Sequence, residues 1–225
     1  MKSKSKIDIK ILISLLVICL LIILFWNTIV VYPIKIFVVL LHEISHGIAA
    51  VITGGSIVKI EISSNQGGVC YTLGGLRFII LSAGYLGSMF WGGLILVMAS
   101  RSKFDKYISI IIGVIILIIT AVFIRNAFGL IYGIVFSLVM VALGWFVNME
   151  VNDFILKVIG LTSILYAIID IKDDLLTRQI PSSDASMLGK FYFGSSTFWG
   201  ILWVIIALLM AFLFLRISSK NRIEY

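Results

Sequence analysis

The sequence is poor in charged residues. Only 13% of its 225 residues are Asp, Glu, Lys or Arg, whereas about a quarter are charged in soluble domains. Hydrophobic residues make up 61% of the chain, and the mean hydropathy is +1.16. This composition excludes an ordinary soluble domain, and several apolar runs approach or exceed the ~20 residues with which a helix crosses a bilayer. The sequence therefore predicts a polytopic protein of the cell membrane, with the lipid bilayer as its surroundings.

Cysteine is scarce as well. Cys19 lies inside the first apolar run and Cys70 in a short loop, with no CxxC pair, so the two indicate neither a redox compartment nor a thiolate metal site. The net charge is +7, but the basic residues stand at the edges of apolar runs, where they anchor helix ends at lipid headgroups. Because no soluble unit is left to carry a basic face, we expect no nucleic-acid partner.

Proline and polar segments are rare enough that the apolar runs can be bounded directly. Seven candidate spans are predicted: Ile11–Val31, Ile36–Ile52, Phe78–Ala99, Tyr107–Phe123, Ala127–Val147, Phe154–Ile171 and Phe198–Leu215. Pro33 marks the first turn, because proline interrupts helical hydrogen bonding. The first run is longer than a signal-peptide core and has no small-x-small cleavage site after it, so we expect a retained span. Residues 1–225 are predicted to form a single all-α membrane domain.

One segment after the second span has a different periodicity. "SIVKIEIS" alternates apolar and polar residues as a strand does, "NQGG" supplies turn residues, and "VCYT" can return as a second strand. We expect a short β-hairpin at the membrane edge, beside the second helix. With seven spans, the basic segments "RSKFDK" and "RISSKNR" fall opposite the basic N-terminus, so Lys and Arg divide about evenly between the two faces. Only the first span then favours a cytoplasmic N-terminus.

Both histidines of the chain lie in one apolar stretch, "VVLLHEISHGIAA". His42 and His46 are four positions apart, so on a helix they project from one face about a turn apart. Two imidazoles in this arrangement can bind one tetrahedral zinc ion and leave room for a third protein ligand and a water. Glu43 would lie beside that water and could act as the general base.

A purely structural interpretation of these residues is also open. A pattern with three fixed positions arises by chance, and a histidine in a membrane helix can simply bond to a neighbour. Against this interpretation, no histidine lies outside the pattern, and a carboxylate within a span costs a few kcal/mol unless it is paired or functional. We therefore favour a metal site.

The stretch "LLHEISHGIAAVITGGSIVKIEIS" resembles the site-2 protease family of intramembrane zinc metallopeptidases. In that family an HExxH helix lies within the membrane and is followed by a glycine and a membrane-associated β-hairpin. "AGYLGS", residues 83–88, is similar to the small-residue stretch on the family's next helix. "SDA" stands in place of the family's Leu-Asp-Gly signature, as in small, divergent, bacterial-type members. The resemblance implies hydrolysis of peptide bonds in or near transmembrane segments of membrane-protein or peptide substrates.

The third ligand has few candidates, since the chain has only 11 acidic residues. Asp170 ends an apolar run, whereas Asp173 and Asp174 flank Lys172 and are typical of solvated charges. The family places a proline three residues before its metal-binding aspartate, and Pro181 precedes Asp184 by three. By that match the resemblance implies Asp184 as the ligand, with Asp170 as the alternative. Ser182, Ser183 and Asp184 could instead all cap a helix that starts at Ala185.

Arg125 and Asn126 interrupt two apolar runs. Asn126 could contact a substrate backbone, although a snorkelling arginine and a turn asparagine are the simpler interpretation. Two rival functions remain. A non-catalytic membrane scaffold would keep the helix pattern without the chemistry, but the intact Glu43 argues against it. A metal or proton transporter would need polar residues on several helices, and the fourth and seventh spans carry almost none.

Overall fold

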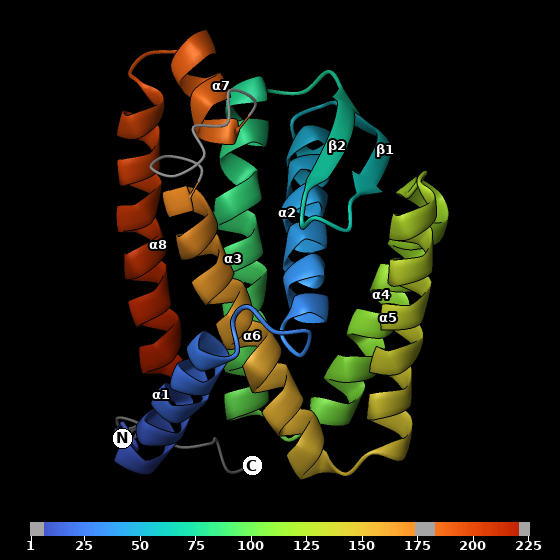
Figure 1. Ribbon diagram of the computed structural model, residues 1–225, viewed down its shortest axis with the longest axis vertical. Coiled ribbons are helices and arrows are strands. Elements are labelled where there is room, and N and C mark those ends of the chain that lie inside the picture. Colours follow the sequence, from blue (N-terminus) through green and yellow to red (C-terminus); the bar gives the residue numbers. More distant parts are fainter. Residues whose placement is uncertain (1–6, 174–182, 221–225) are drawn as a thin grey trace, which may run out of the picture.

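The computed structural model describes residues 7–173 and 183–220, most of which are helical (Figure 1). In chain order the elements are α1 (Ile9–Leu24), α2 (Tyr32–Ile52), β1 (Ser56–Ile62), β2 (Gly68–Leu73), α3 (Arg77–Arg101), α4 (Asp105–Phe123), α5 (Ala127–Phe146), α6 (Met149–Lys172), α7 (Asp184–Phe191) and α8 (Ser196–Ser218). Within the described part of the chain, six helices are long and apolar enough to cross a membrane: α2 to α6 and α8. The protein is thus an all-α, multi-pass integral membrane protein, as the sequence predicts.

The first predicted span differs from the helix that the structure shows there. Asp8 caps the N-terminus of α1 by accepting from the backbone N–H of Lys10, and the helix ends at Leu24 after only 16 residues. At 1.5 Å per residue it is about 24 Å long, which is short of the ~30 Å hydrocarbon core. Turns follow it until α2 begins, with Pro33 in the first turn of that helix. The apolar run Ile11–Val31 is therefore not one continuous spanning helix.

The two ends of the described chain lie side by side. The backbone N–H of Asp8 donates to the carbonyl oxygen of Ser219 at 2.7 Å, and Ile7 forms an isolated antiparallel bridge with Lys220. The start of α1 and the end of α8 consequently share one end of the molecule, the lower one in Figure 1.

The predicted hairpin is present and packs on α2. β1 and β2 pair antiparallel, and a Cβ at Gly47 of α2 would lie 2.6 Å from the Ile57 side chain. The other edge of β1 is occupied by the α4–α5 connection: Ile124 forms a parallel bridge with Ile60, and Arg125 donates its backbone N–H to the Ile60 carbonyl at 3.1 Å. The hairpin is thus held between α2 and the α4–α5 pair.

Packing places α2 at the centre of the molecule. In its most apolar 18-residue window 78% of residues are buried, against 28% in α4 and in α8. On the other side of α2, α3 packs closely against α6, because a Cβ at Gly160 would lie 2.8 Å from the carbonyl oxygen of Gly92. Helices that face lipid can be apolar throughout. On the buried face of α2, polar side chains are kept away from lipid and can contact one another.

Candidate metal centre

His42 and His46 extend from the same face of α2. Their ring centroids are 4.7 Å apart and nearly perpendicular, at 75°. His46 is only 8% exposed. The four-residue spacing inside an uninterrupted helix produces this arrangement, as expected from the sequence.

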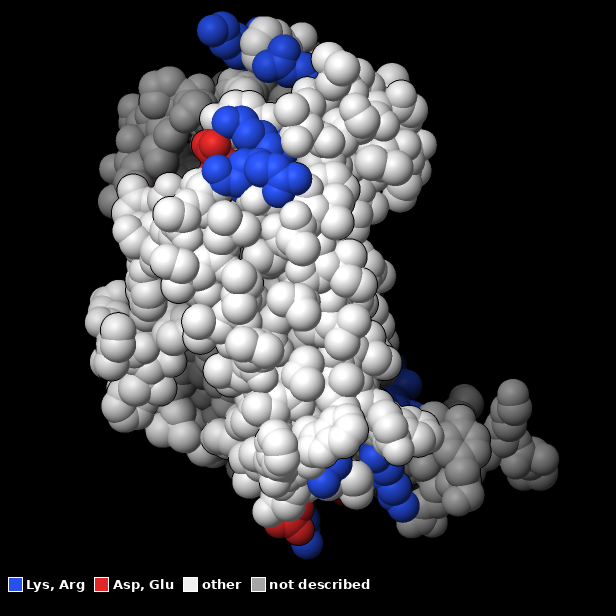
Figure 2. Space-filling model, turned by 90° about the vertical axis from the view of Figure 1, so that its right-hand side faces the viewer, with Lys and Arg blue, Asp and Glu red and all other residues white. Residues whose placement is uncertain are grey.

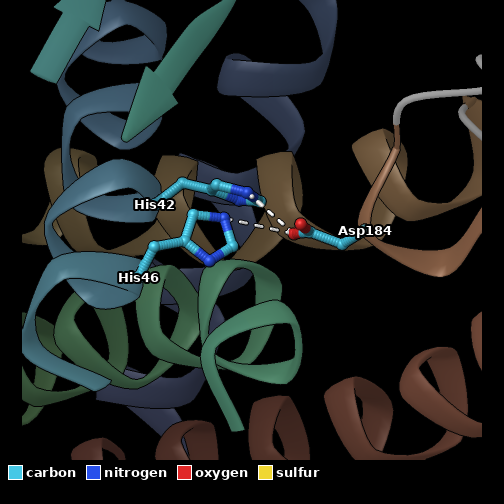
Figure 3. Close-up of side chains that lie close together, drawn as sticks. All are labelled: His42, His46 and Asp184. Atoms are coloured by element: carbon cyan, nitrogen blue, oxygen red, sulfur yellow. Dashed lines mark ion pairs between the residues drawn. The ribbon is translucent and has the colours of Figure 1, made fainter. Parts of the chain in front are cut away.

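Asp184 approaches both imidazoles from α7 (Figure 3). Its Oδ2 lies 3.2 Å from Nε2 of His42 and 3.3 Å from Nε2 of His46. Ser183, rather than Asp184, is the N-cap of α7, because its side chain accepts the backbone N–H of Ser186. Since the cap is supplied by the preceding residue, the Asp184 carboxylate is left to face the histidines.

The three side chains fit a tetrahedral metal ion. Ligand atoms about 2.0–2.1 Å from a tetrahedral zinc lie roughly 3.3–3.4 Å from one another, and both measured nitrogen–oxygen distances are close to that value. Within the described residues, His42, His46 and Asp184 are the group of ligating side chains whose donor atoms lie within 4.8 Å of one another. Oδ2 of Asp184 is buried, and the two Nε2 atoms are its polar neighbours. Two imidazoles and a carboxylate are also a donor set that catalytic zinc sites use.

The orientation of His46 is fixed from its other side. Nδ1 lies 2.7 Å from the backbone carbonyl oxygen of Ile80 on α3. A carbonyl can only accept, so Nδ1 carries a proton and Nε2 is the ring nitrogen left to bind a metal ion. Metal-binding histidines are commonly oriented by such a second contact. His42 instead packs edge-on against the Tyr85 ring, with centroids 4.8 Å apart.

Glycine lets α3 approach the imidazoles. A Cβ at Gly84 would lie 2.3 Å from Nε2 of His42 and 2.6 Å from Cε1 of His46. One turn later, a Cβ at Gly87 would lie 2.3 Å from Oγ of Ser45. The two glycines of "AGYLGS" therefore allow α2 and α3 to be in direct contact at the histidines.

Glu43 lies next to the histidines and against the hairpin. It is 5% exposed, a Cβ at Gly68 would lie 2.7 Å from its Oε1, and the backbone amide of Cys70 approaches its carboxylate. His42, Glu43, His46 and Asp184 all line one cavity of about 720 Å³, whose other walls are β2, α3 and α6. Two carboxylates and two imidazoles thus share one cavity.

A family model described as Peptidase M50B-like matches residues 15–214. The chain belongs to this family. Searches of curated proteins and of solved structures found no match to it. Membership in the M50B-like family supports a membrane metallopeptidase, and the cluster of His42, His46 and Asp184 is compatible with a metal ion in it.

Electrostatics in this M50B-like chain favour an ionised Asp184. Burial alone would raise the pKa of its carboxyl, but the neighbouring His46 and His42 outweigh burial and hold that pKa well below its usual range. On β2 the opposite holds for Cys70: burial, together with the negative charge of Glu43, raises the pKa of its thiol to about 12. Asp184 therefore offers an anionic oxygen to a cation, whereas Cys70 is kept as a neutral thiol.

The alternative ligand, Asp170, lines the same cavity but does not belong to the three-residue cluster. Asp173 is partly buried, with Oδ1 3.9 Å from Nζ of Lys172. Asp174, Pro181 and Ser182 lie outside the described residues.

Asn126 holds the end of β1 through its side-chain amide. Its Nδ2 donates to the carbonyl oxygen of Ile62 at 2.7 Å, and its Oδ1 accepts the backbone N–H of Ile62 at 3.1 Å. Both ends of the amide are thereby used to hold the end of β1, and Asn126 is not part of the cavity wall. Contact of Asn126 with a substrate stays a prediction.

Several residues of the site escape sequence reasoning. The carbonyl of Ile80 carries no side-chain signal, and nothing in the sequence singles out its partnership with His46. Gly68 could have been noticed, since it ends the turn signal "NQGG", but its proximity to Glu43 depends on how the hairpin packs on α2. Tyr85 lies within the small-residue stretch that was quoted for its glycines.

Proposed function

We propose that this M50B-like protein is an intramembrane zinc metallopeptidase that hydrolyses peptide bonds in or near transmembrane segments of other membrane proteins. His42, His46 and Asp184 are the zinc ligands, and Glu43 is the general base. The observation that carries the proposal is the position of Oδ2 of Asp184, 3.2 Å and 3.3 Å from the two Nε2 atoms. The two histidines lie on α2 and Asp184 lies on α7, and these helices are more than 130 positions apart in the sequence. The fold therefore brings Asp184 to the histidines.

When bound, zinc would polarise the scissile carbonyl and favour ionisation of a nearby water. Glu43 accepts a proton from the attacking water at its carboxylate, and the water oxygen forms a bond to the carbonyl carbon. As the C–N bond breaks, Glu43 returns the proton to the departing nitrogen. His46 stays oriented throughout, because Ile80 holds its Nδ1–H. The Glu43 carboxylate is suited to this cycle because it is buried beside the imidazoles. Among the ion pairs of the described residues, none includes Glu43, so its oxygens are available to a water molecule.

β2 supports a polypeptide as the substrate. Residues 66–72 of the hairpin line the cavity that holds Glu43. Within the described sheet β2 pairs only with β1, while the opposite edge of β1 is occupied by Ile124. An unwound segment of substrate can therefore extend the sheet along β2, where main-chain hydrogen bonds would present it to the site without a strict sequence requirement.

The test compares the wild-type chain with Glu43→Gln in cells. Gln preserves size and hydrogen bonding but cannot accept the proton, so cleavage should fall by about 10²–10⁴-fold. Membrane proteins or fragments that accumulate uncut in the variant, identified by mass spectrometry, are the substrates. Equal zinc content of the two purified proteins is the control for an intact site. Normal processing by a zinc-loaded Glu43→Gln protein would contradict the assignment of the base.

A further inference from the structure

Arg77 is a basic residue on the wall of the catalytic cavity. It is the first residue of α3, and among the described residues that line the cavity no other is Lys or Arg. Figure 2 shows that charged side chains on one face of the molecule gather near its two ends, with an uncharged band between them, as expected for a protein embedded in lipid. As the exposed first residue of a spanning helix, Arg77 lies at a membrane boundary, where its guanidinium stays charged.

The Arg77 side chain is held by an aromatic ring rather than by an acid. Its Cζ lies 3.7 Å from the centroid of the Phe191 ring, at the end of α7. Stacking covers one face of the planar guanidinium and leaves the N–H donors at its edge free for another partner. No ion pair within the described part of the chain includes Arg77. The side chain is therefore positioned in advance, with its charge facing a cavity.

Helix stability does not account for a cation at this position. The N-terminus of a helix carries a partial positive charge, so Asp and Glu are favourable in the first turn, whereas Lys and Arg are favourable in the last. The first turn of α3 has no acidic residue, and its N-cap, Leu76, makes no side-chain cap. Arg77 thus costs the helix stability, and a role in the cavity is the better explanation of its presence.

The other charged groups of the cavity make Arg77 selective for one position. Glu43, Asp170 and Asp184 also line the cavity, so a second carboxylate close to them is repelled. A carboxylate at Arg77 is attracted instead, and a guanidinium can bind it through two parallel N–H···O bonds. A negatively charged substrate group is consequently favoured at this edge of the cavity and disfavoured beside the catalytic groups.

The spacing along α3 relates Arg77 to the bond that is cut. Ile80, whose carbonyl accepts the Nδ1–H of His46, follows Arg77 by about one turn. One turn rises ~5 Å and helical side chains lean toward the N-terminus, so an extended Arg77 places its guanidinium roughly 10 Å from the level of His46. β2 ends at Leu73, four residues before Arg77, and a strand added along it rises ~3.4 Å per residue. Roughly 10 Å corresponds to about three substrate residues.

We propose that Arg77 is a specificity-determining residue, which binds a carboxylate of the substrate about three residues from the scissile bond. The inference rests on the proposed function and names its substrate class: membrane proteins with a carboxylate at the membrane boundary, next to the segment that is cleaved. An Asp or Glu side chain and the C-terminus of a substrate offer the same chemistry, and the experiment distinguishes them.

Specificity is measured by competition between synthetic peptides. Each peptide consists of Leu, Ala and Gly with an amidated C-terminus and a single Glu, which is moved along the series; its matched peptide has Gln at the same position. A further peptide has Gln and a free C-terminal carboxylate. The purified, zinc-loaded full chain cleaves equimolar pairs, and mass spectrometry gives the ratio of initial rates and the bond that is cut. Because both peptides share one reaction, the ratio does not depend on the amount of active protein.

The wild type should cleave the Glu peptide about 3–10-fold faster than the Gln peptide, at a bond about three residues from Glu and always on the same side of it. Arg77→Gln should lower the ratio to about one. Arg77→Glu should reverse the selectivity and favour a peptide with Lys over one with Glu, which a merely structural role of Arg77 does not predict. A free C-terminus that replaces Glu in this effect would identify the terminal carboxylate as the group that is bound.

Lys190→Gln is the matched control. Lys190 is exposed, its Nζ lies 5.8 Å from the centroid of the same Phe191 ring, and it does not line the cavity. The variant should keep the wild-type ratio. Equal losses of selectivity in Arg77→Gln and Lys190→Gln would mean that both cations act through the lipid surface and would overturn the inference. A wild-type ratio of about one for every carboxylate, or an undiminished ratio in Arg77→Gln, would overturn it as well.

A binding measurement separates this inference from the proposed function. In Glu43→Gln protein the same peptide pairs compete with a photo-crosslinkable Leu/Ala peptide, so selectivity is read without cleavage. An inert wild type whose binding still shows a preference that depends on Arg77 would refute the proposed function alone. Cleavage of both peptides at equal rates would refute the role of Arg77 alone, and the absence of both cleavage and preference would refute the two together.

Discussion

His46 and Ile80 are joined by a contact of 2.7 Å between Nδ1 and the backbone carbonyl oxygen. The contact links α2 to α3 at the level of the site and determines which imidazole nitrogen is free. Because the carbonyl accepts a hydrogen bond from Nδ1–H, Nε2 is the ring nitrogen left to bind a metal ion. The backbone of α3 therefore prepares His46 as a ligand, and Gly84, on the next turn of the same helix, leaves the space that both imidazoles occupy.

The identity of the third ligand can be tested with two aspartates in one cavity. Asp184→Asn removes the anionic oxygen that lies beside both Nε2 atoms. We expect zinc affinity to fall by at least about tenfold, since even the loss of an outer-shell partner costs ~10–100-fold. Competition with a zinc chelator of known affinity measures the change in the purified protein.

Asp170→Asn is the matched control. It removes the same charge from the wall of the same cavity, but from outside the three-residue cluster. Its zinc affinity should stay within about threefold of wild type, since a charge lost outside the ligand cluster carries only a modest electrostatic effect. A larger loss of zinc in Asp170→Asn than in Asp184→Asn would reverse the assignment of the ligand.

The close approach of α3 predicts the effect of a single methyl group. In Gly84→Ala the new Cβ would meet Nε2 of His42 at 2.3 Å, so His42 or the helix must shift. Overpacking of this kind typically costs about 1–3 kcal/mol, and here the shift moves a ligand. We expect weaker zinc binding with helix content unchanged, measured by chelator competition and circular dichroism. Ser82→Ala, on the same helix, should change neither; equal zinc affinity in Gly84→Ala and wild type would contradict the contact.

The spanning helices were predictable because apolar length is a local property of the sequence. Predicted Ala127–Val147 and observed Ala127–Phe146 differ by one residue. The hairpin was equally local, with strand alternation around a turn signal. The prediction of a span over Ile11–Val31 was wrong for the same reason: its composition allows a span, and only packing against α6 and α8 and the bond between Asp8 and Ser219 bring its start beside the end of α8.

The site was predictable to the extent that helical spacing or a family signature determines it. His42, Glu43 and His46 follow from one helical turn, whereas Asp184 could be ranked above Asp170 only by its resemblance to a proline-containing signature. Residues alone do not show that Ser183 takes the capping role and leaves Asp184 free to face the histidines. The hydrogen bonds of Asn126 with Ile62 join segments 64 positions apart, so no local sequence pattern predicts them.

The state of Cys70 gives a prediction about pH. With a pKa of about 12, about one thiol in ten thousand is ionised at pH 8, against roughly a quarter for an ordinary cysteine. Because burial and the charge of Glu43 favour the protonated thiol, alkylation by iodoacetamide should be ~10³-fold slower than for an exposed cysteine and should rise about tenfold per pH unit up to pH 10. Mass spectrometry of the peptide that contains Cys70 measures the rate, with Lys190→Cys as the exposed reference.

Replacing Glu43 separates the two causes. Glu43→Gln removes the negative charge but preserves burial, so the alkylation of Cys70 should become faster while staying slower than at Lys190→Cys. A wild-type rate equal to that of the exposed cysteine would show that Cys70 is not buried against α2.

The measurement closest to the central claim is the zinc content of the purified chain. Two imidazoles and a carboxylate within 4.8 Å of one another predict about one zinc ion per chain after mild detergent extraction. The double variant His42→Ala, His46→Ala removes two of the three ligands and should retain almost none, with its helix content checked by circular dichroism. Elemental analysis by mass spectrometry gives both numbers. About one zinc in the wild type and close to zero in the double variant is the result predicted here; a wild-type chain without zinc, or a folded double variant with undiminished zinc, would contradict it.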